Sequence, residues 1–327
     1  FLLRLIYKSM NLDKSISIIG CGISGIFAAL HLKKRGLKNI RLFDKSRGVG
    51  GRLATRRSSE GKFDHGAQYL KLDDIYDLPE IKSLIKNNIL KETKVPNVYI
   101  GDDGMTSIPK FLSKDLSVSK EFKLIRINEN KDKISLIFEN GQEIISDSII
   151  FSSPIKQSIE ILDRSNVNID NDKFNGVRSL EYSPGIILMI ESENSINLNY
   201  EFFQENPSDD FSFISDNYRK TISKKENFYT LICSTNFSVK NFEKEYDEIN
   251  SMLKPELDII FNKKYNILSN HKWRYSIPIN FYPNDDSLNI GLNNFIGMCG
   301  DIFTNGNFGG AIKSGISIAE KYMKNEV

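Results

Sequence analysis

Short apolar runs separated by turn residues recur along this chain, and the first two frame a glycine-rich turn. Residues 16–19 form a β-branched run typical of a buried parallel strand. Residues 26–37 predict a helix, with Phe27 and Leu37 among its apolar positions, and residues 41–43 predict a second strand. This order of strand, turn, helix and strand indicates an α/β fold with a parallel sheet.

Strand and turn signals continue through the rest of the chain. Residues 104–109 predict a turn and the start of a helix, with Pro109 in its first turn. Turns at residues 130–131 and 140–141 separate short apolar runs. We expect later strands at residues 122–127, 134–138, 144–145, 148–151, 186–190, 229–233 and 295–298, and a last helix at residues 311–323.

Composition narrows the class of protein. The 327 residues are enough for two domains and a sizeable core. The balance of 44 basic and 42 acidic residues gives no sign of nucleic-acid binding. No apolar run reaches 18 residues, so we expect no membrane span. The three cysteines and three histidines are scattered, which predicts neither disulfides nor a metal site and suits a reducing cytoplasm.

The first residues lack a methionine and carry a short apolar run. Met10 lies six residues before the first expected strand, so we expect Met10 to be the natural start. Residues 1–9 are then expected to be a disordered extension, with a cleaved signal peptide as the alternative.

The glycine-rich turn has the spacing of a dinucleotide site. Gly20 permits a sharp turn, Gly22 lets the backbone approach a pyrophosphate, and Gly25 lets the helix pack closely on the strand. The start of the helix offers free N–H groups to phosphates. Asp44 follows Gly20 by 24 residues and can accept hydrogen bonds from a ribose 2′-hydroxyl. Because Asp44 would repel a 2′-phosphate, the dinucleotide held here should not be NADP.

A second motif favours FAD over NAD. Gly50-Gly51-Arg52 resembles the second signature of the flavoprotein family that contains amine oxidases, phytoene desaturases and protoporphyrinogen oxidases. The resemblance implies an arginine near the pyrophosphate and flavin. Two glycines allow close approach, and Arg52 can neutralise a phosphate bidentately.

A closer resemblance is to the renalases, particularly the bacterial ones. It rests on residues 51–57, residues 63–69, the Lys-Trp-Arg-Tyr segment at 272–275, and the C-terminal motif at 299–315. The middle of the chain matches only loosely. The resemblance implies a Rossmann-type FAD-binding domain of the glutathione reductase and amine oxidase type, with a second, mixed α+β substrate domain.

The motifs and the resemblance together select two sets of residues. Gln68, Tyr69, Trp273 and Arg274 are the candidates for facing the substrate, and no general base is expected. Trp273 suits stacking on a flat ring but equally suits a core anchor, and Arg274 suits a substrate phosphate or a protein carboxylate. His65 is expected to cap a turn rather than act as a base. The candidates for binding FAD are Gly20, Gly22, Ser24, Gly25, Asp44, Lys45, Gly51, Arg52, Gly66, Ala67, Gln68, Leu124, Gly300, Asp301, Asn307, Phe308 and Ala311.

The expected FAD-binding domain is discontinuous. It comprises residues 10–73, 101–154 and 284–327, and the substrate domain comprises residues 74–100 and 155–283. Cys299 lies on the strand side of Gly300, so we expect FAD to be bound non-covalently.

The resemblance implies an FAD-dependent oxidase that converts aberrant 2- or 6-dihydro isomers of NAD(P)H to NAD(P)+, with O2 reduced to H2O2. A flavin amine oxidase or desaturase of the same fold is one alternative. A non-catalytic binding protein that has lost flavin is another, although the intact glycine motifs argue against it. Monomer and homodimer both remain open.

Overall fold

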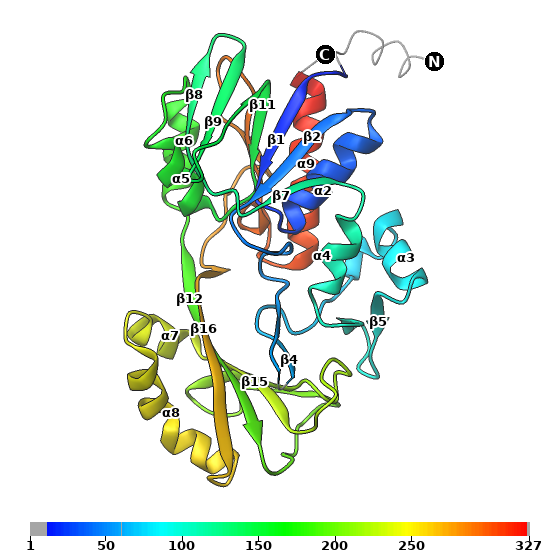
Figure 1. Cartoon of the computed structure of the whole chain (residues 1–327), viewed down its shortest axis with the longest axis vertical. Coiled ribbons are helices and arrows are strands. Elements are labelled where there is room, and N and C mark those ends of the chain that lie inside the picture. Colours follow the sequence, from blue (N-terminus) through cyan, green and yellow to red (C-terminus); the bar gives the residue numbers. More distant parts are fainter. Residues whose placement is uncertain (1–11, 60, 326–327) are drawn as a thin grey trace. The chain divides into compact units, whose positions relative to one another are not determined.

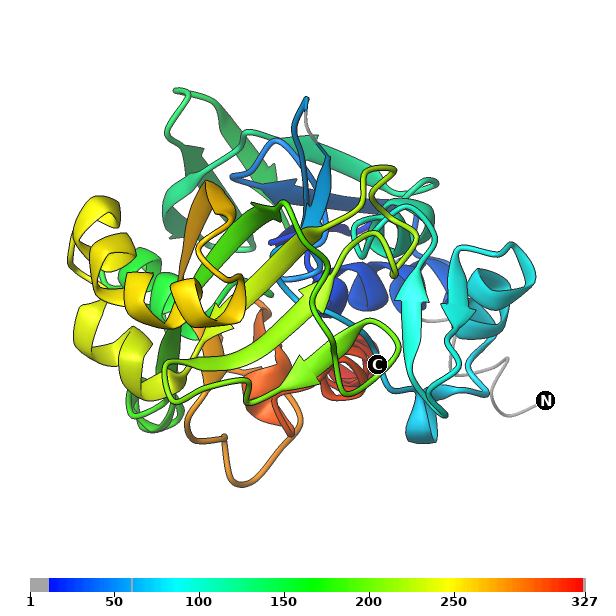
Figure 2. The same ribbon diagram turned by 90° about the horizontal axis from the view of Figure 1, so that it is seen from below.

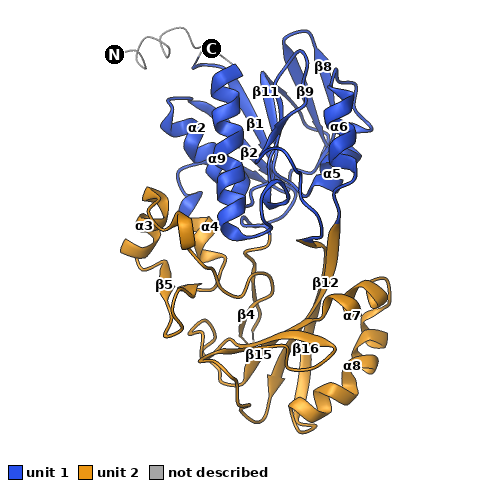
Figure 3. Ribbon diagram, turned by 180° about the vertical axis from the view of Figure 1, so that it is seen from behind, with its two compact units in different colours: residues 1–51, 112–181, 278–327 blue, residues 52–111, 182–277 orange. Residues whose placement is uncertain are grey.

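The chain divides into two compact units, which we describe separately (Figure 3). The computed structural model describes residues 12–59 and 61–325, so the expectations for Met10 and residues 1–9 lie outside the described residues. Unit 1 holds the described residues up to Gly51, Leu112–Glu181, and those from Pro278 onward. Unit 2 holds Arg52–Phe111 and Tyr182–Ile277.

Unit 1 is built on a six-stranded sheet (Figure 1). Strand β1 pairs in parallel with β2 and β11, and β7 and β18 extend the sheet in parallel on either side. An antiparallel edge strand, β17, closes one side. The sheet order is β17 (Leu288–Asn289), β18 (Ile296–Met298), β11 (Ser148–Phe151), β1 (Ser15–Ile19), β2 (Asn39–Asp44) and β7 (Ser117–Lys120).

Helices and a small antiparallel sheet complete unit 1. Helix α2 (Ile23–Lys34) packs closely against α9 (Phe308–Asn325). Glycine at position 315 permits this approach, since a Cβ there would lie 2.3 Å from the Ser24 carbonyl oxygen. The sheet contains β10 (Glu143–Ser146), β9 (Lys133–Phe138) and β8 (Leu124–Asn130). The remaining helices are α5 (Ile155–Leu162), α6 (Asn171–Arg178) and the short η2 (Asp301–Phe303).

Unit 2 has a five-stranded sheet with helices α7 (Thr235–Asn241) and α8 (Tyr246–Ile260) packed against it (Figure 2). Apolar residues of β12 meet Phe237 of α7 and Leu253 of α8 in one buried cluster. The order in the sheet is β13 (Phe203–Glu205), β14 (Phe211–Asp216), β15 (Phe228–Cys233), β12 (Tyr182–Ser192) and β16 (Tyr265–Pro278).

Smaller elements lie in the first segment of unit 2. Two antiparallel pairs are β3 (Thr55–Arg57) with β4 (Lys62–Asp64), and β5 (Leu90–Glu92) with β6 (Tyr99–Gly101). The helices there are η1 (Asp73–Ile75), α3 (Pro79–Lys86) and α4 (Ser107–Leu112).

The expected α/β class, with a Rossmann-type parallel sheet and a second mixed domain, is confirmed. The predicted helix at residues 26–37 is shifted, because α2 already begins at Ile23 and ends at Lys34. Gly36 has φ +101°, which ends the helix before Leu37. The last helix likewise begins at Phe308, three residues before the predicted start.

The compact units divide the chain at other points than the sequence-based domains. Residues 52–73 and 101–111 lie in unit 2, where Phe63 of β4 packs against Phe228 of β15. Residues 155–181 and 278–283 lie in unit 1, where α5 contacts β8. The assignment of FAD and substrate to particular segments stays a prediction.

Candidate functional site

The first turn of unit 1 is shaped by its three glycines. Gly20 has φ +104°, which favours glycine. A Cβ on Gly25 would lie 2.4 Å from the Gly20 carbonyl oxygen, so this close approach requires glycine. Gly22 differs, because a Cβ there would meet no atom within 4 Å. Neither the turn nor the packing needs glycine at position 22, and the space beside it is open to a ligand.

The start of α2 is suited to an anion. Its N-cap residue is Gly22, no side chain caps the helix, and its first turn has no acidic residue. The first N–H groups of a helix have no partner within the helix and carry partial positive charge. Ser24 is buried in this first turn. A pyrophosphate placed beside Gly22 would satisfy these donors.

Asp44 lies at the end of β2 and braces the same turn. One carboxylate oxygen accepts from the Cys21 N–H at 2.8 Å, and the other accepts from the Ser46 N–H at 2.8 Å. Carboxylate oxygens have further lone pairs, so a ribose hydroxyl remains a compatible partner. Phe122 N–H donates to the Asp44 carbonyl, which brings the start of β8 at Leu124 toward this end of β2. The adjacent Lys45 is exposed.

The C-terminal motif makes a second open turn in unit 1. Gly300 has φ +155°, and a Cβ there would meet no atom within 4 Å. Asp301 is buried beside it. Asn307 caps α9, because its side-chain oxygen accepts from the Gly310 N–H at 2.8 Å. Phe308 and Ala311 lie in the first turn of that helix. The open space beside Gly22 and Gly300, the start of α2 without a side-chain cap, and the carboxylate of Asp44 fit a bound dinucleotide.

Arg52, Gly66 and Ala67 come together at the start of unit 2. The Ala67 N–H donates to the Arg52 carbonyl at 2.9 Å, and a Cβ on Gly66 would lie 1.9 Å from that carbonyl oxygen. The Arg52 guanidinium donates to the Ser276 carbonyl of β16 at 3.0 Å. Gly66 is therefore required for this loop contact, whatever Arg52 binds.

Three rings form a compact group in unit 2, which we call the ring group: His65, His271 and Trp273. The His65 and Trp273 rings are stacked, with centroids 5.8 Å apart and planes 16° apart. His271 meets Trp273 edge-on at 4.5 Å and His65 edge-on at 4.8 Å. The Trp273 indole N–H also donates to the His65 carbonyl at 2.7 Å.

Both imidazoles of the ring group are held in the uncharged form. Burial, aided by the Arg56 guanidinium, lowers the pKa of His65 to about 4. Burial also lowers the pKa of His271 to about 4, with His65 and Arg56 adding to the effect. Arg56 contacts the His271 ring nitrogen Nδ1 at 3.4 Å. The sequence interpretation of scattered histidines missed this pairing.

The two faces of β16 carry different chemistry. Successive side chains of a strand alternate between faces, so His271, Trp273 and Tyr275 share one face. Tyr275 meets Tyr182 edge-on at 5.6 Å. Arg274 lies on the opposite face, where it pairs with Glu243 and covers the Phe242 ring. The structure therefore does not bring Arg274 together with Trp273.

Gln68 and Tyr69 enter two further clusters. The buried Gln68 amide donates to the carbonyls of Asp64 and Gly66, and its oxygen accepts from Ser215 at 2.7 Å. The Tyr69 hydroxyl donates to Glu205, and its ring packs against Phe203. Neither partner belongs to the ring group. Their roles toward flavin or substrate stay predictions.

A buried ion pair holds the loop that carries His65. Lys220 and Asp64 are fully buried, with the ammonium 2.6 Å from a carboxylate oxygen. Asp64 also accepts from Thr55 at 2.6 Å and from the Met105 N–H at 2.9 Å. Sequence reasoning missed both members of the pair. Asp64 stood in a recognised motif without a role, and no local signal marked Lys220.

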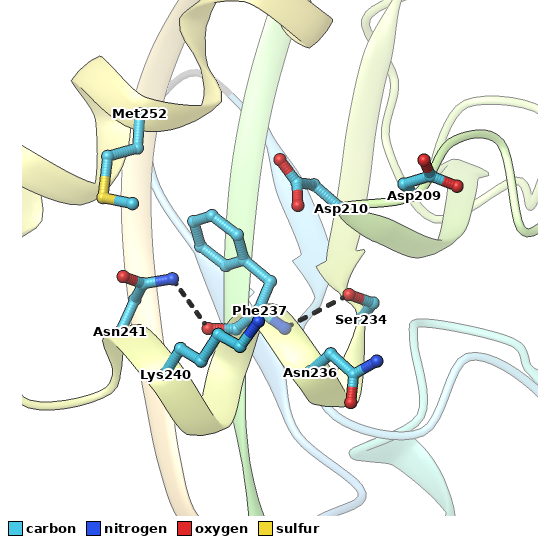
Figure 4. A pocket seen from close by; sticks show the side chains of 8 residues that line it. All are labelled: Asp209, Asp210, Ser234, Asn236, Phe237, Lys240, Asn241 and Met252. Carbon is cyan, nitrogen blue, oxygen red and sulfur yellow. Dashed lines mark hydrogen bonds between the residues drawn. The ribbon is translucent and has the colours of Figure 1, made fainter.

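One pocket lies elsewhere in unit 2 (Figure 4). It has a volume of about 390 Å³ and contains none of the predicted site residues. Within residues 12–59 and 61–325, no group of three His, Cys, Asp or Glu residues could hold a metal ion. Across the same residues no helix is both long and apolar enough to span a membrane. The pocket is lined by Asp209, Asp210, Ser234, Asn236, Phe237, Lys240, Asn241 and Met252.

Comparisons with known proteins agree with this geometry. Residues 18–85 match the NAD(P)-binding Rossmann-like domain family. Renalase from Mus musculus is 23% identical over 336 residues, covering 93% of this chain and 97% of that protein. A putative protoporphyrinogen oxidase from Exiguobacterium sp. 255-15 has the same fold, with TM-score 0.70, 11% identity, and coverage of 97% and 100%. A putrescine oxidase bound to putrescine gives TM-score 0.70, 12% identity, and coverage of 95% and 99%.

The renalase alignment and the Rossmann-like family match together indicate an FAD-dependent oxidoreductase with non-covalently bound FAD. Since renalase aligns with nearly the whole chain, the protein is more particularly a renalase-like flavin oxidoreductase.

Proposed function

We propose that this protein is an oxidase that converts dihydronicotinamide dinucleotides reduced at the 2 or 6 position to NAD(P)+, with O2 reduced to H2O2. The observation that carries the proposal is the alignment with mouse renalase along 93% of this chain. When bound, FAD accepts a hydride and passes two electrons to dioxygen, so that one hydride, one proton and O2 give H2O2.

The cofactor would be held by unit 1. Gly22 and the start of α2 would take the pyrophosphate, and Asp44 would take a ribose hydroxyl. Gly300 and Asp301 would lie along the flavin side of the dinucleotide. The partial positive charge at the start of α9 would favour an anionic reduced flavin.

The ring group of unit 2 supports the proposal of a substrate whose reacting ring is flat and uncharged. Trp273 is partly exposed and offers an aromatic surface for stacking. One charged side chain that contacts the ring group is the Arg56 guanidinium, which lies 3.4 Å from Nδ1 of His271. Loss of hydride from a dihydropyridine removes no proton, so the reaction needs no general base. The low pKa values of the two imidazoles, which make them weak bases, are therefore compatible with it. These features are compatible with a dihydronicotinamide as the reacting ring.

An anaerobic absorbance titration tests the proposal. The purified yellow protein is mixed with partially borohydride-reduced NAD+, which contains the isomeric dihydro forms, and separately with pure 4-dihydro NADH. We expect the mixture to bleach the flavin rapidly and NADH to do so slowly. If both leave the flavin oxidised while putrescine or another amine bleaches it, the amine oxidase alternative replaces this proposal.

A further inference from the structure

We infer that His65 is a positioning residue that fixes the plane of the Trp273 indole through its main-chain carbonyl and its ring together. The inference rests on the proposed function, in which Trp273 is the surface that stacks with the substrate ring. It goes beyond the turn-capping role that the sequence suggested for His65.

Two independent contacts define the indole plane. The hydrogen bond from the Trp273 N–H to the His65 carbonyl, at 2.7 Å, fixes one edge of the ring. The nearly parallel His65 imidazole supports one face, with 16° between the planes. His271 makes a further, T-shaped contact with the indole, with ring centroids 4.5 Å apart. A ring held by a hydrogen bond and by contacts with two other rings has few rotamers left, and Trp273 is still partly exposed.

The main chain at His65 is itself held in place by the contacts of the preceding residue, Asp64. Residue 65 follows Asp64, whose carboxylate is fixed by Lys220 at 2.6 Å and by Thr55 at 2.6 Å. The Asp64 carbonyl also accepts from the Gln68 amide at 2.8 Å. Any displacement of the His65 carbonyl would therefore disturb a fully buried ion pair, which makes such displacement costly.

The imidazoles contribute as rings rather than as proton carriers. His65 is 8% exposed, and its Nδ1 is buried without a hydrogen-bond partner, as is Nε2 of His271. The charged groups around them are Arg56, which contacts His271, and Asp64, whose charge is balanced by Lys220. Since the nicotinamide product carries a positive charge, uncharged supporting rings add no repulsion against it.

The single tryptophan of the chain makes the inference directly measurable. Time-resolved fluorescence anisotropy of the full-length holoprotein reports how freely the Trp273 indole moves. We expect slow depolarisation in the wild type and a new fast component in His65→Ala. In His65→Phe we expect the wild-type behaviour, because a phenyl ring can stack and the lost Nδ1 had no partner. His31→Ala is the matched control, because His31 lies in unit 1 and pairs with Glu320.

Two further readouts keep the test decisive. We expect kcat/KM for the isomeric dihydro-NAD mixture to fall at least tenfold in His65→Ala and to recover in His65→Phe, with FAD content unchanged. In the unmutated protein, the indole should gain mobility as the pH falls to about 4, where His65 and His271 charge, and the gain should be smaller in His65→Phe. Two results would overturn the inference. One is a gain of indole mobility already near pH 6.5, the ordinary pKa of histidine, and the other is slow depolarisation retained in His65→Ala. If no dihydro isomer bleaches the flavin of the wild-type protein, the proposed function fails. The anisotropy result still decides the role of His65 in that case.

Discussion

At the scale of single residues, the buried Lys220–Asp64 pair places a strong constraint on unit 2. Both side chains have no exposed surface, and burial lowers the pKa of Lys220. Such a pair contributes modest net stability while intact, but it leaves an uncompensated buried charge when one partner is lost. The effect of mutation should therefore depend on whether one or both charges are removed.

We predict that Lys220→Met lowers the free energy of unfolding by about 3–5 kcal/mol, because Asp64 would remain buried and unpaired. The double variant Lys220→Met/Asp64→Asn should recover part of this loss. Lys62→Met is the matched control, since its exposed pair with Asp103 should contribute about 1 kcal/mol or less. Urea unfolding of all four proteins measures these values, and equal losses for Lys220→Met and Lys62→Met would contradict the prediction.

The two buried imidazoles predict a pH dependence of stability. In the folded state the pKa values of His65 and His271 are about 4, below the ordinary value of 6.5. Between these values the unfolded chain binds more protons, so stability is complete above pH 6.5 and declines as the pH falls toward 4. Each group contributes a slope of up to about 1.4 kcal/mol per pH unit.

We therefore expect the free energy of unfolding to fall by a few kcal/mol between pH 6.5 and pH 4.5. His65→Phe should show a shallower decline over this window, because one of the two groups no longer takes up a proton. Denaturant unfolding at several pH values measures the slope. A His65→Phe slope equal to that of the wild type would contradict the low pKa of His65.

At the scale of elements, the periodic runs predicted most strands of unit 1 and its helices α2 and α9, but not its helices α5 and α6. Residues 16–19, 148–151 and 229–233 all lie in strands. The helix boundaries failed where backbone geometry outweighs apolar periodicity, as at Gly36 with φ +101°. The alternation of His271, Trp273 and Tyr275 along β16 was readable in principle. Its consequence, that Arg274 faces the other way, followed only once the strand was known.

The first glycine turn gives a matched pair of variants. We predict that Gly25→Ala destabilises the protein and abolishes FAD binding, because the new Cβ would lie 2.4 Å from the Gly20 carbonyl oxygen. Gly22→Ala should cost about 1 kcal/mol or less in the FAD-free protein, since its Cβ meets no atom within 4 Å. It should still weaken FAD binding strongly by filling the space beside the start of α2.

Thermal unfolding with and without added FAD separates the two cases. Gly22→Ala should have a Tm without FAD that is at most slightly below that of the FAD-free wild type, but it should lose the upward shift that FAD produces. Should Gly22→Ala bind FAD as tightly as the wild type, the open space at Gly22 would not be the pyrophosphate site.

At the scale of the whole molecule, the motifs selected the first glycine turn and the β16 segment, whose roles at the site stay predictions, but they did not indicate the limits of the compact units. Residues 52–73 follow Gly51 directly, so they read as part of the same domain. Their burial instead depends on partners more than 150 residues away, such as Lys220 with Asp64 and Phe228 with Phe63. Pairings over such separations leave no periodic signal in the sequence, which is why the ring group and the buried ion pair emerged only from the structure.

The whole protein should release its flavin intact on denaturation. A covalent thioether needs an accessible thiol that ionises, and all three cysteines are buried. Burial, with Asp44 adding to it, raises the pKa of Cys21 to about 12, and burial also raises the pKa of Cys299. We therefore expect acid precipitation to leave about one FAD per chain in the supernatant and a colourless pellet. A yellow pellet would contradict non-covalent binding, and Cys299→Ser would then show whether the thiol nearest the C-terminal turn is the attachment point.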